Sequence, residues 1–114
     1  MEREVWEVIR SHTEAVISGD PVAMAADYAN DAVLIRPEAE FKGRKEIEAY
    51  FSTVPERLGE GVVVFDKLDV DGEIVKFWWH LEGGSVHGVS GCDKCEVRGG
   101  LIVSQKVFLN ESDF

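Results

Sequence analysis

One carboxyl group in this sequence stands where an apolar side chain would be expected. It is Asp93, in the run GCDKCEVR at residues 91–98. Side chains of a strand alternate between the two faces of a sheet, so Asp93 shares a face with the apolar residues Val89, Cys95 and Val97. Burial disfavours the anion and raises the pKa of a carboxyl group. We therefore predict that Asp93 faces the interior and can transfer a proton near neutral pH; the alternative is a bulge near Gly91 that turns the carboxylate outward.

A histidine is the second candidate. His12 lies three residues after Ile9 and four before Val16, which places it on the apolar side of a helix. An imidazole there could donate a hydrogen bond or move a proton near neutral pH. The alternative is a core histidine that is bonded to a backbone carbonyl.

The third candidate is Arg36, which shares a strand face with Ala32 and Leu34. Its guanidinium could lie at the mouth of a cavity and bind a carboxylate or an enolate. It could also point into solvent, or form a salt bridge with Asp93 that keeps the carboxylate ionised. The sequence leaves these three alternatives open.

The two cysteines, Cys92 and Cys95, form a CxxC pattern. On a strand their thiols point to opposite faces, which suits neither a disulfide nor a shared metal ion. His80 and His87 do not supply further ligands at a convincing spacing. We expect two free thiols, no metal site and no cofactor.

Composition limits the partners of the chain. Its 114 residues include 22 acidic and 12 basic ones, for a formal net charge of −10, and no cluster of Lys and Arg is found along the sequence. Such a surface repels phosphate backbones and anionic lipid, so we expect neither nucleic acid nor membrane as a partner. No apolar run approaches the roughly 20 residues of a membrane helix, and no signal peptide is evident, so we expect a cytoplasmic protein.

The elements that must position these residues follow from periodicity and turn signals. A helix is predicted over 3–18, ended by Gly19, and Asp20-Pro21 begins a second helix that reaches Asn30. A strand over 32–36 ends at Pro37, and a third helix begins near Lys45, with Pro55 kinking or ending it. From Val62 onward the chain is predicted to form antiparallel strands over 62–70, 73–82, 86–97 and 101–109. Helices followed by a meander of strands indicate one α+β domain over residues 1–114.

This order resembles the ketosteroid isomerase and nuclear transport factor 2-like superfamily, in its SnoaL-like branch. The segments that carry the resemblance are SGDPVAMAADYANDAVLI, FKGRKEIEAYF and EVRGGLIVSQKVF. The resemblance implies a cone-shaped α+β barrel, in which a strongly curved antiparallel sheet wraps around the N-terminal helix, with two further helices and an apolar cavity. It also implies a homodimer through the outer sheet face, where Trp78 and His80 are predicted to lie.

The resemblance also assigns positions in the cavity. In ketosteroid isomerases a phenol donor on the first helix falls on His12, the aspartate base falls on Arg36, and the protonated aspartic acid of the oxyanion hole falls on Asp93. Steroid isomerisation by that mechanism is therefore not expected, although Glu38 or Glu40 could replace the base. Tyr50 and Phe51 fall on pocket-lining aromatics, and Tyr28, Phe77 and Trp79 are further substrate-binding candidates.

Two functions are compatible with this pattern. The first is a cofactor-independent acid–base enzyme of the isomerase, cyclase or dehydratase type, which acts on a small, largely apolar organic molecule. Asp93 would transfer the proton, His12 would donate to the developing oxyanion, and Arg36 would hold negative charge. The second is a non-catalytic domain that binds a small molecule or a protein partner. We favour the enzyme.

Overall fold

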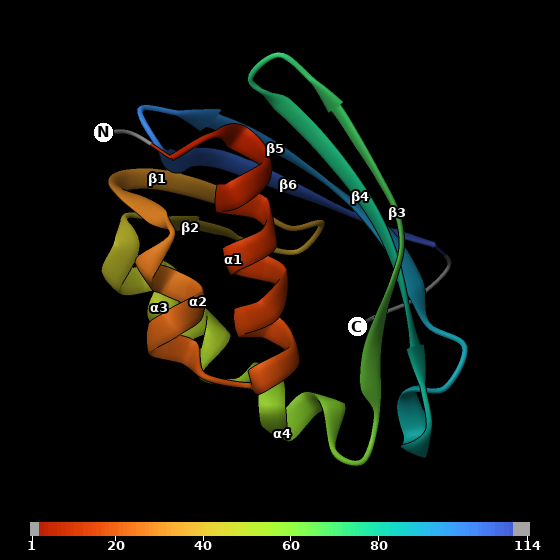
Figure 1. Cartoon of the computed structure of the whole chain (residues 1–114). Helices are drawn as coiled ribbons and strands as arrows, with labels where there is room; N and C mark the ends of the chain where they lie inside the picture. Colours follow the sequence, from red (N-terminus) through yellow and green to blue (C-terminus); the bar gives the residue numbers. More distant parts are fainter. Residues whose placement is uncertain (1–2, 111–114) are drawn as a thin grey trace.

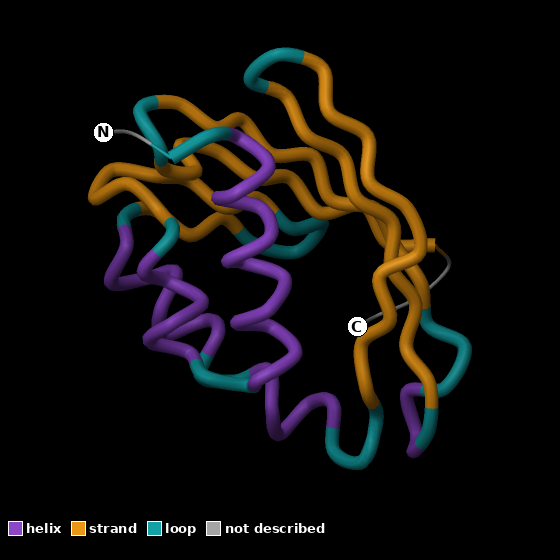
Figure 2. Tube along the Cα trace, viewed as in Figure 1, coloured by secondary structure: helices purple, strands orange, loops and turns teal. Residues whose placement is uncertain are grey.

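A computed structural model describes residues 3–110, which form four α-helices, one short 3₁₀ helix and six strands (Figures 1 and 2). The helices are α1 (Val5–Ser18), α2 (Pro21–Ala26), α3 (Arg44–Phe51), α4 (Val54–Leu58) and the 3₁₀ helix η1 (Gly84–Val86). The strands are β1 (Tyr28–Ile35), β2 (Glu40–Lys42), β3 (Val62–Asp71), β4 (Ile74–Glu82), β5 (Ser90–Arg98) and β6 (Leu101–Asn110).

All six strands belong to one sheet, in the order β2-β1-β6-β5-β4-β3. Figure 1 shows this sheet bending around α1, with the other α-helices on the same concave side, so the predicted cone-shaped α+β fold is confirmed. The expectation of a wholly antiparallel sheet is wrong for one pair, because β1 runs parallel to β6. These two strands lie at opposite ends of the chain, so no tight turn forces them to be antiparallel.

The helices differ from the prediction in number and length. Asp20 caps α2 as expected, accepting hydrogen bonds from the backbone N–H groups of Val22 and Ala23. The helix nevertheless ends at Ala26, because the chain enters β1 at Tyr28, which is fully buried. Pro55 neither kinks nor ends α3; it stands in the first turn of the separate helix α4, where no backbone N–H is required. Within residues 3–110, three α-helices therefore follow α1, not two.

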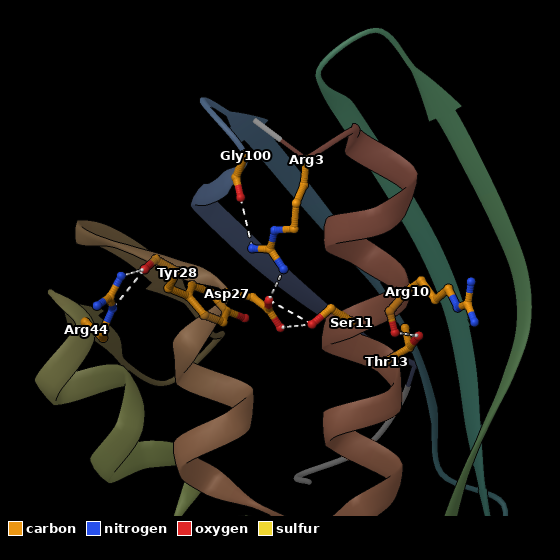
Figure 3. Close-up of polar contacts among 8 residues, drawn as sticks. All are labelled: Arg3, Arg10, Ser11, Thr13, Asp27, Tyr28, Arg44 and Gly100. Atoms are coloured by element: carbon orange, nitrogen blue, oxygen red, sulfur yellow. Dashed lines mark hydrogen bonds and ion pairs between the residues drawn. The ribbon is translucent and has the colours of Figure 1, made fainter. Parts of the chain in front are cut away.

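A buried carboxylate fixes α1 against the sheet (Figure 3). Asp27, at the end of α2, accepts hydrogen bonds from Ser11 of α1 (2.9 and 3.1 Å) and from Arg3 (2.8 Å). Arg3 also donates to the carbonyl of Gly100 in the turn between β5 and β6 (2.9 Å), and Arg44 of α3 donates to the carbonyl of Tyr28 (2.9 Å). These bonds join α1, α3, β1 and the β5–β6 turn, which holds His12 in a fixed place relative to the sheet.

Candidate active site

Asp93 lies on the concave face of β5, as predicted. It is opposite Phe77 of β4 and Val107 of β6, and 7% of the residue's surface is exposed. Its Oδ1 accepts a hydrogen bond from the indole Nε1 of Trp79 at 2.9 Å, and its Oδ2 accepts one from Nε2 of Gln105. Because an indole N–H can only donate, Asp93 is held here as a hydrogen-bond acceptor.

The environment of Asp93 gives it a pKa near neutrality. Burial raises the pKa to about 6, against the opposing effect of the hydrogen bonds from Trp79 and Gln105 and of the positive charge of Arg36. The predicted direction of the shift is therefore confirmed. A group of this kind is largely ionised at neutral pH, yet takes up a proton with little cost.

A buried hydrogen-bonded chain leads from Asp93 to His12. Gln105 accepts a hydrogen bond from the Tyr28 hydroxyl, which lies 3.5 Å from Nε2 of His12. His12 is 2% exposed, and burial lowers its pKa to about 4, against the opposing effect of Asp27 and the Met24 carbonyl. His12 is therefore neutral at physiological pH.

Arg36 follows β1 and is also buried, with 5% of its surface exposed. Its Nε donates to Glu38 at 2.6 Å and its Nη1 donates to the Tyr50 hydroxyl at 2.7 Å. Within residues 3–110, Nη2 is buried without a hydrogen-bond partner. Of the three alternatives left open by the sequence, the structure contains neither the solvent-facing arginine nor the salt bridge to Asp93.

The two glutamates considered as replacement bases are not buried. The Glu38 side chain is 59% exposed. Its partial burial raises the pKa, but the hydrogen bond with Arg36 acts against burial, and the pKa of Glu38 is lowered overall. Glu40 is exposed at the start of β2. Neither has the environment of a general base, whereas Asp93 does.

The side chains of Asp93, His12 and Arg36 lie around a cavity of about 80 Å³ between α1, α3, α4 and the concave face of the sheet. Its polar lining consists of His12, Arg36, Tyr50, Asp93 and Gln105. Its apolar lining includes Leu34, Phe51, Phe65, Phe77, Trp79 and Val107. All three predicted catalytic candidates therefore reach one cavity, as do four of the five predicted substrate-binding residues.

Tyr28 is the exception among the predicted residues. It is fully buried, but it is not among the described residues that line the cavity; it lies behind Gln105 and packs edge-on against His12, with ring centroids 5.4 Å apart. Sequence reasoning missed Gln105 itself. The signal was available, because Gln105 alternates with Val107 in β6 and so shares its face.

The remaining sequence predictions concern cysteines, metals and membranes. Cys95 is buried and Cys92 is half-buried on the other face of β5, and both are free thiols, as expected. Within residues 3–110 no group of three His, Cys, Asp or Glu side chains is arranged to hold a metal ion. None of the helices in this range has the length and apolar character needed to cross a membrane.

Solved structures similar to this one show the same fold. A candidate ketosteroid isomerase from Kribbella flavida has a TM-score of 0.82 at 20% identity, over 96% of this chain and 80% of that chain. A Catenulispora acidiphila protein with a ketosteroid isomerase-like fold, solved in complex with trimethylamine, has a TM-score of 0.78 at 19% identity, over 93% and 87%. A de novo designed protein with a curved β-sheet has a TM-score of 0.81 at 20% identity, over 97% and 89%. At these identities the likeness concerns the fold alone.

The sequence itself was compared with protein families and with curated proteins. No curated protein matches it significantly. The family model of the SnoaL-like domain matches residues 9–105, which is most of the 114-residue chain. The chain therefore belongs to the SnoaL-like domain family.

Proposed function

We propose that this chain is a cofactor-independent acid–base enzyme, of the isomerase, cyclase or dehydratase type, acting on a small and largely apolar organic molecule. The observation that carries the proposal is Asp93: a buried carboxylate with a pKa of about 6, held as an acceptor beside an apolar cavity. All three reaction types can begin with removal of a proton from carbon, which requires such a base.

The other polar groups take supporting roles in this mechanism. Asp93 removes the proton, and Arg36 with Tyr50 stabilises the negative charge that remains on the substrate. His12 is neutral and lies close to the Tyr28 hydroxyl, so it acts on Asp93 through the Tyr28–Gln105 pair. The aromatic walls exclude water, which strengthens these electrostatic interactions.

A test of the proposal needs no knowledge of the natural substrate. The protein is incubated in D₂O with a panel of small carbon acids (ketones, nitriles and nitroalkanes), and exchange of their C–H groups is followed by NMR. We expect catalysed exchange for at least one class, with a loss of about a hundredfold or more in Asp93→Asn. Asp69→Asn, an exposed carboxylate on the outer face of β3, should leave the rate unchanged. Equal rates in wild type and Asp93→Asn would contradict the proposal.

The alternative is a domain that binds a small molecule without converting it. The presence of Arg36, where ketosteroid isomerases place their base, favours this second function. The neighbour from Catenulispora acidiphila holds trimethylamine, so a cavity of this fold can hold a small molecule. Binding of a panel compound in the cavity without any Asp93-dependent exchange would support the binding domain over the enzyme.

We also propose a homodimer through the convex face of the sheet. Trp78, Cys92 and Phe108 are direct neighbours on β4, β5 and β6 on that face, and Phe108 is 46% exposed. A row of this kind can form the centre of a self-complementary interface. Sedimentation equilibrium should detect a dimer at micromolar concentration, and Trp78→Glu should dissociate it. A wild-type protein that sediments as a monomer would contradict the dimer.

A further inference from the structure

Four buried polar side chains form one hydrogen-bonded row beside the cavity. Gln105 donates from Nε2 to Asp93 and accepts the Tyr28 hydroxyl at Oε1, and the same hydroxyl lies 3.5 Å from Nε2 of His12. None of the four residues is more than 7% exposed. The two inner members, Gln105 and Tyr28, each carry a donor and an acceptor, so the row can be satisfied in either of two directions.

We propose that this row is a two-position switch: the Gln105 amide turns over when Asp93 takes up a proton, the Tyr28 hydroxyl turns with it, and His12 changes its tautomer. Gln105 and Tyr28 are then positioning residues for Asp93. Their role in turnover rests on the proposed function, whereas the switch itself depends only on the protonation of Asp93.

The structure shows the direction that suits the anion. A carboxylate can only accept, so Gln105 presents Nε2 to Asp93, and its Oε1 faces Tyr28. The Tyr28 hydroxyl keeps its single proton, because burial raises the pKa of this phenol well above its ordinary value. That proton is used on Gln105, so His12 can bond to Tyr28 only as a donor, through a proton on Nε2.

Protonation of Asp93 reverses these requirements. Oδ1 already accepts from the Trp79 indole, which can only donate, so a proton on Oδ2 has Gln105 as its neighbour. Nε2 of Gln105 cannot accept this proton, whereas Oε1 can accept it once the amide has turned. Nε2 then donates to the Tyr28 oxygen, and the Tyr28 hydroxyl donates to an unprotonated Nε2 of His12.

The far end of the row allows His12 to follow this change. Within residues 3–110 its Nδ1 is buried without a hydrogen-bond partner, so no such bond selects one tautomer. The Met24 carbonyl opposes the lowering of the His12 pKa by burial, but it makes no hydrogen bond of regular geometry to Nδ1. One proton leaves Nε2 and one arrives at Nδ1, carried by water, because His12 lines the cavity. The net uptake by the row is therefore the single proton of Asp93.

The surroundings of the row are charged as well. The titratable groups that face it from neighbouring positions are Asp27 after α2, Arg36 after β1, Tyr50 of α3, and Cys92 and Cys95 of β5. Asp27 is bonded to Arg3 and Ser11, Arg36 stays charged, and burial raises the pKa of both thiols. Asp93, with a pKa of about 6, is therefore the group that we expect to change charge between pH 5 and 8.

A switch of this kind suits a group that acts first as a base and then as an acid. The Asp93 anion has two donors, from Trp79 and Gln105. After it has taken a proton, the turned amide offers an acceptor, so neither form leaves a buried polar group of the pair without a partner. Both forms that an acid–base cycle requires are then accessible.

The first test is a pH titration of ¹³C,¹⁵N-labelled wild-type protein, followed by NMR at the Asp93 carboxyl carbon, the Gln105 side-chain amide and the ring nitrogens of His12. The ¹⁵N shift of a ring nitrogen differs widely between its protonated and unprotonated forms, so the tautomer is measured directly. From pH 8 to pH 5, the ratio of the Nε2–H to the Nδ1–H tautomer should fall about tenfold or more, the effect of about one buried hydrogen bond. The midpoint should coincide with that of Asp93. A constant tautomer while Asp93 titrates, or an Asp93 that does not titrate in this range, would overturn the inference.

Variants then test the route between the two ends. Tyr28→Phe keeps the ring and removes the link, so Asp93 should still titrate while His12 keeps one tautomer from pH 5 to 8. Thr13→Val is the control, because it removes a hydroxyl that bonds to the Arg10 carbonyl, outside the row, and it should leave the coupling unchanged. A wild-type response of His12 in folded Tyr28→Phe would mean that Asp93 acts on His12 through space, and the switch would be wrong.

Deuterium exchange of the carbon acids separates this inference from the proposed function. A His12 tautomer that follows Asp93, without any catalysed exchange, would contradict the enzyme and leave the switch standing. Asp93-dependent exchange with a constant His12 tautomer would do the reverse.

Discussion

The two faces of β4, β5 and β6 differ sharply, although they are built from alternate residues of the same strands. On the concave face, the polar side chains Asp93 and Gln105 are buried, and Gln105 donates a hydrogen bond to Asp93. Asp93 also accepts a hydrogen bond from Trp79, and Gln105 accepts one from Tyr28. On the convex face, Lys76, Lys94 and Lys106 lie directly opposite one another in a single cross-strand row. All three are exposed, and none forms an ion pair within residues 3–110.

This difference shows how strongly solvent determines the effect of a charge. Like charges on neighbouring strands are tolerated on the convex face, because water screens them and long lysine side chains can separate. The single carboxylate on the concave face needs two donors, and its pKa is still raised to about 6 by burial. Charge changes on the concave face should therefore have much larger effects than changes on the convex face.

The largest effects should appear in the pH dependence of stability. Asp93 has a pKa of about 6, above its ordinary value of 3.8, so its contribution to stability is full below pH 4 and is lost as pH rises to 6. His12 has a pKa of about 4, below its ordinary value of 6.5, so its contribution is full above pH 6.5 and is lost as pH falls to 4. Each term amounts to about 3 kcal/mol, and between pH 4 and 6 the two nearly cancel.

Removing either group should reveal the pH dependence that the other contributes to stability. As pH rises from 4 to 6.5, the unfolding free energy of Asp93→Asn should increase by about 3 kcal/mol relative to that of wild type, because only the His12 contribution remains. Over the same rise in pH, the unfolding free energy of His12→Gln should decrease by about as much. Urea denaturation across this range checks both, with the exposed Glu14→Gln on α1 as a control. If both variants follow the wild-type pH profile, the two groups are not buried as described.

A steric change on the concave face should have the next largest effect. Gly91 is buried beside Asp93, and a Cβ at this position would lie 2.6 Å from the Trp79 ring and 2.7 Å from the Phe108 carbonyl oxygen. Gly91→Ala should therefore displace the indole that donates to Asp93 and destabilise the fold by about 1–3 kcal/mol.

Two measurements check the Gly91→Ala prediction. Loss of the bond from Trp79 should raise the pKa of Asp93 above that of the wild type, which an NMR titration of the carboxyl carbon detects. Cys92→Ala, at the adjacent position on the convex face, should have a small effect on both stability and titration. An unshifted Asp93 pKa in Gly91→Ala would mean that Trp79 does not control the carboxyl group.

Features that depend on local alternation could be predicted from the sequence. The inward position of Asp93, Phe77 and Trp79 follows from a period of two along single strands, and the C-terminal end of α1 and the start of α2 follow from Gly19 and Asp20. These are properties of a few consecutive residues.

Features that depend on which strands become neighbours could not be predicted in this way. The parallel pairing of β1 with β6, the contact of Gln105 with Tyr28, and the lysine row all join residues that are distant in the chain. The free nitrogen of Arg36 belongs to the same class, because it depends on Tyr50 of α3 having already engaged Nη1. No basic cluster is found along the sequence, because Lys76, Lys94 and Lys106 are adjacent only in the folded sheet.

The lysine row provides the smallest of the expected effects. Lys94 lies between Lys76 and Lys106, so a glutamate at this position would replace two repulsive neighbours by two attractive ones. The chain already has a formal net charge of −10, and a further negative charge would by itself destabilise the compact state. Lys94→Glu should nevertheless be more stable than wild type by about 0.5 kcal/mol at low salt, because the local contacts outweigh the change in net charge.

The matched control is Lys42→Glu, which makes the same change in net charge at an exposed position on β2, outside the row and beside Glu46. It should be neutral or slightly destabilising. The gain in stability of Lys94→Glu should disappear in 1 M salt, where the screening length falls to about 3 Å. The pKa of Asp93 should be the same in Lys94→Glu as in wild type, because the substituted side chain lies on the opposite face of β5. Urea denaturation at both salt concentrations measures the difference. If Lys94→Glu and Lys42→Glu change stability equally, net charge and not the row governs the convex face, and the contrast between the two faces would rest on the buried side alone.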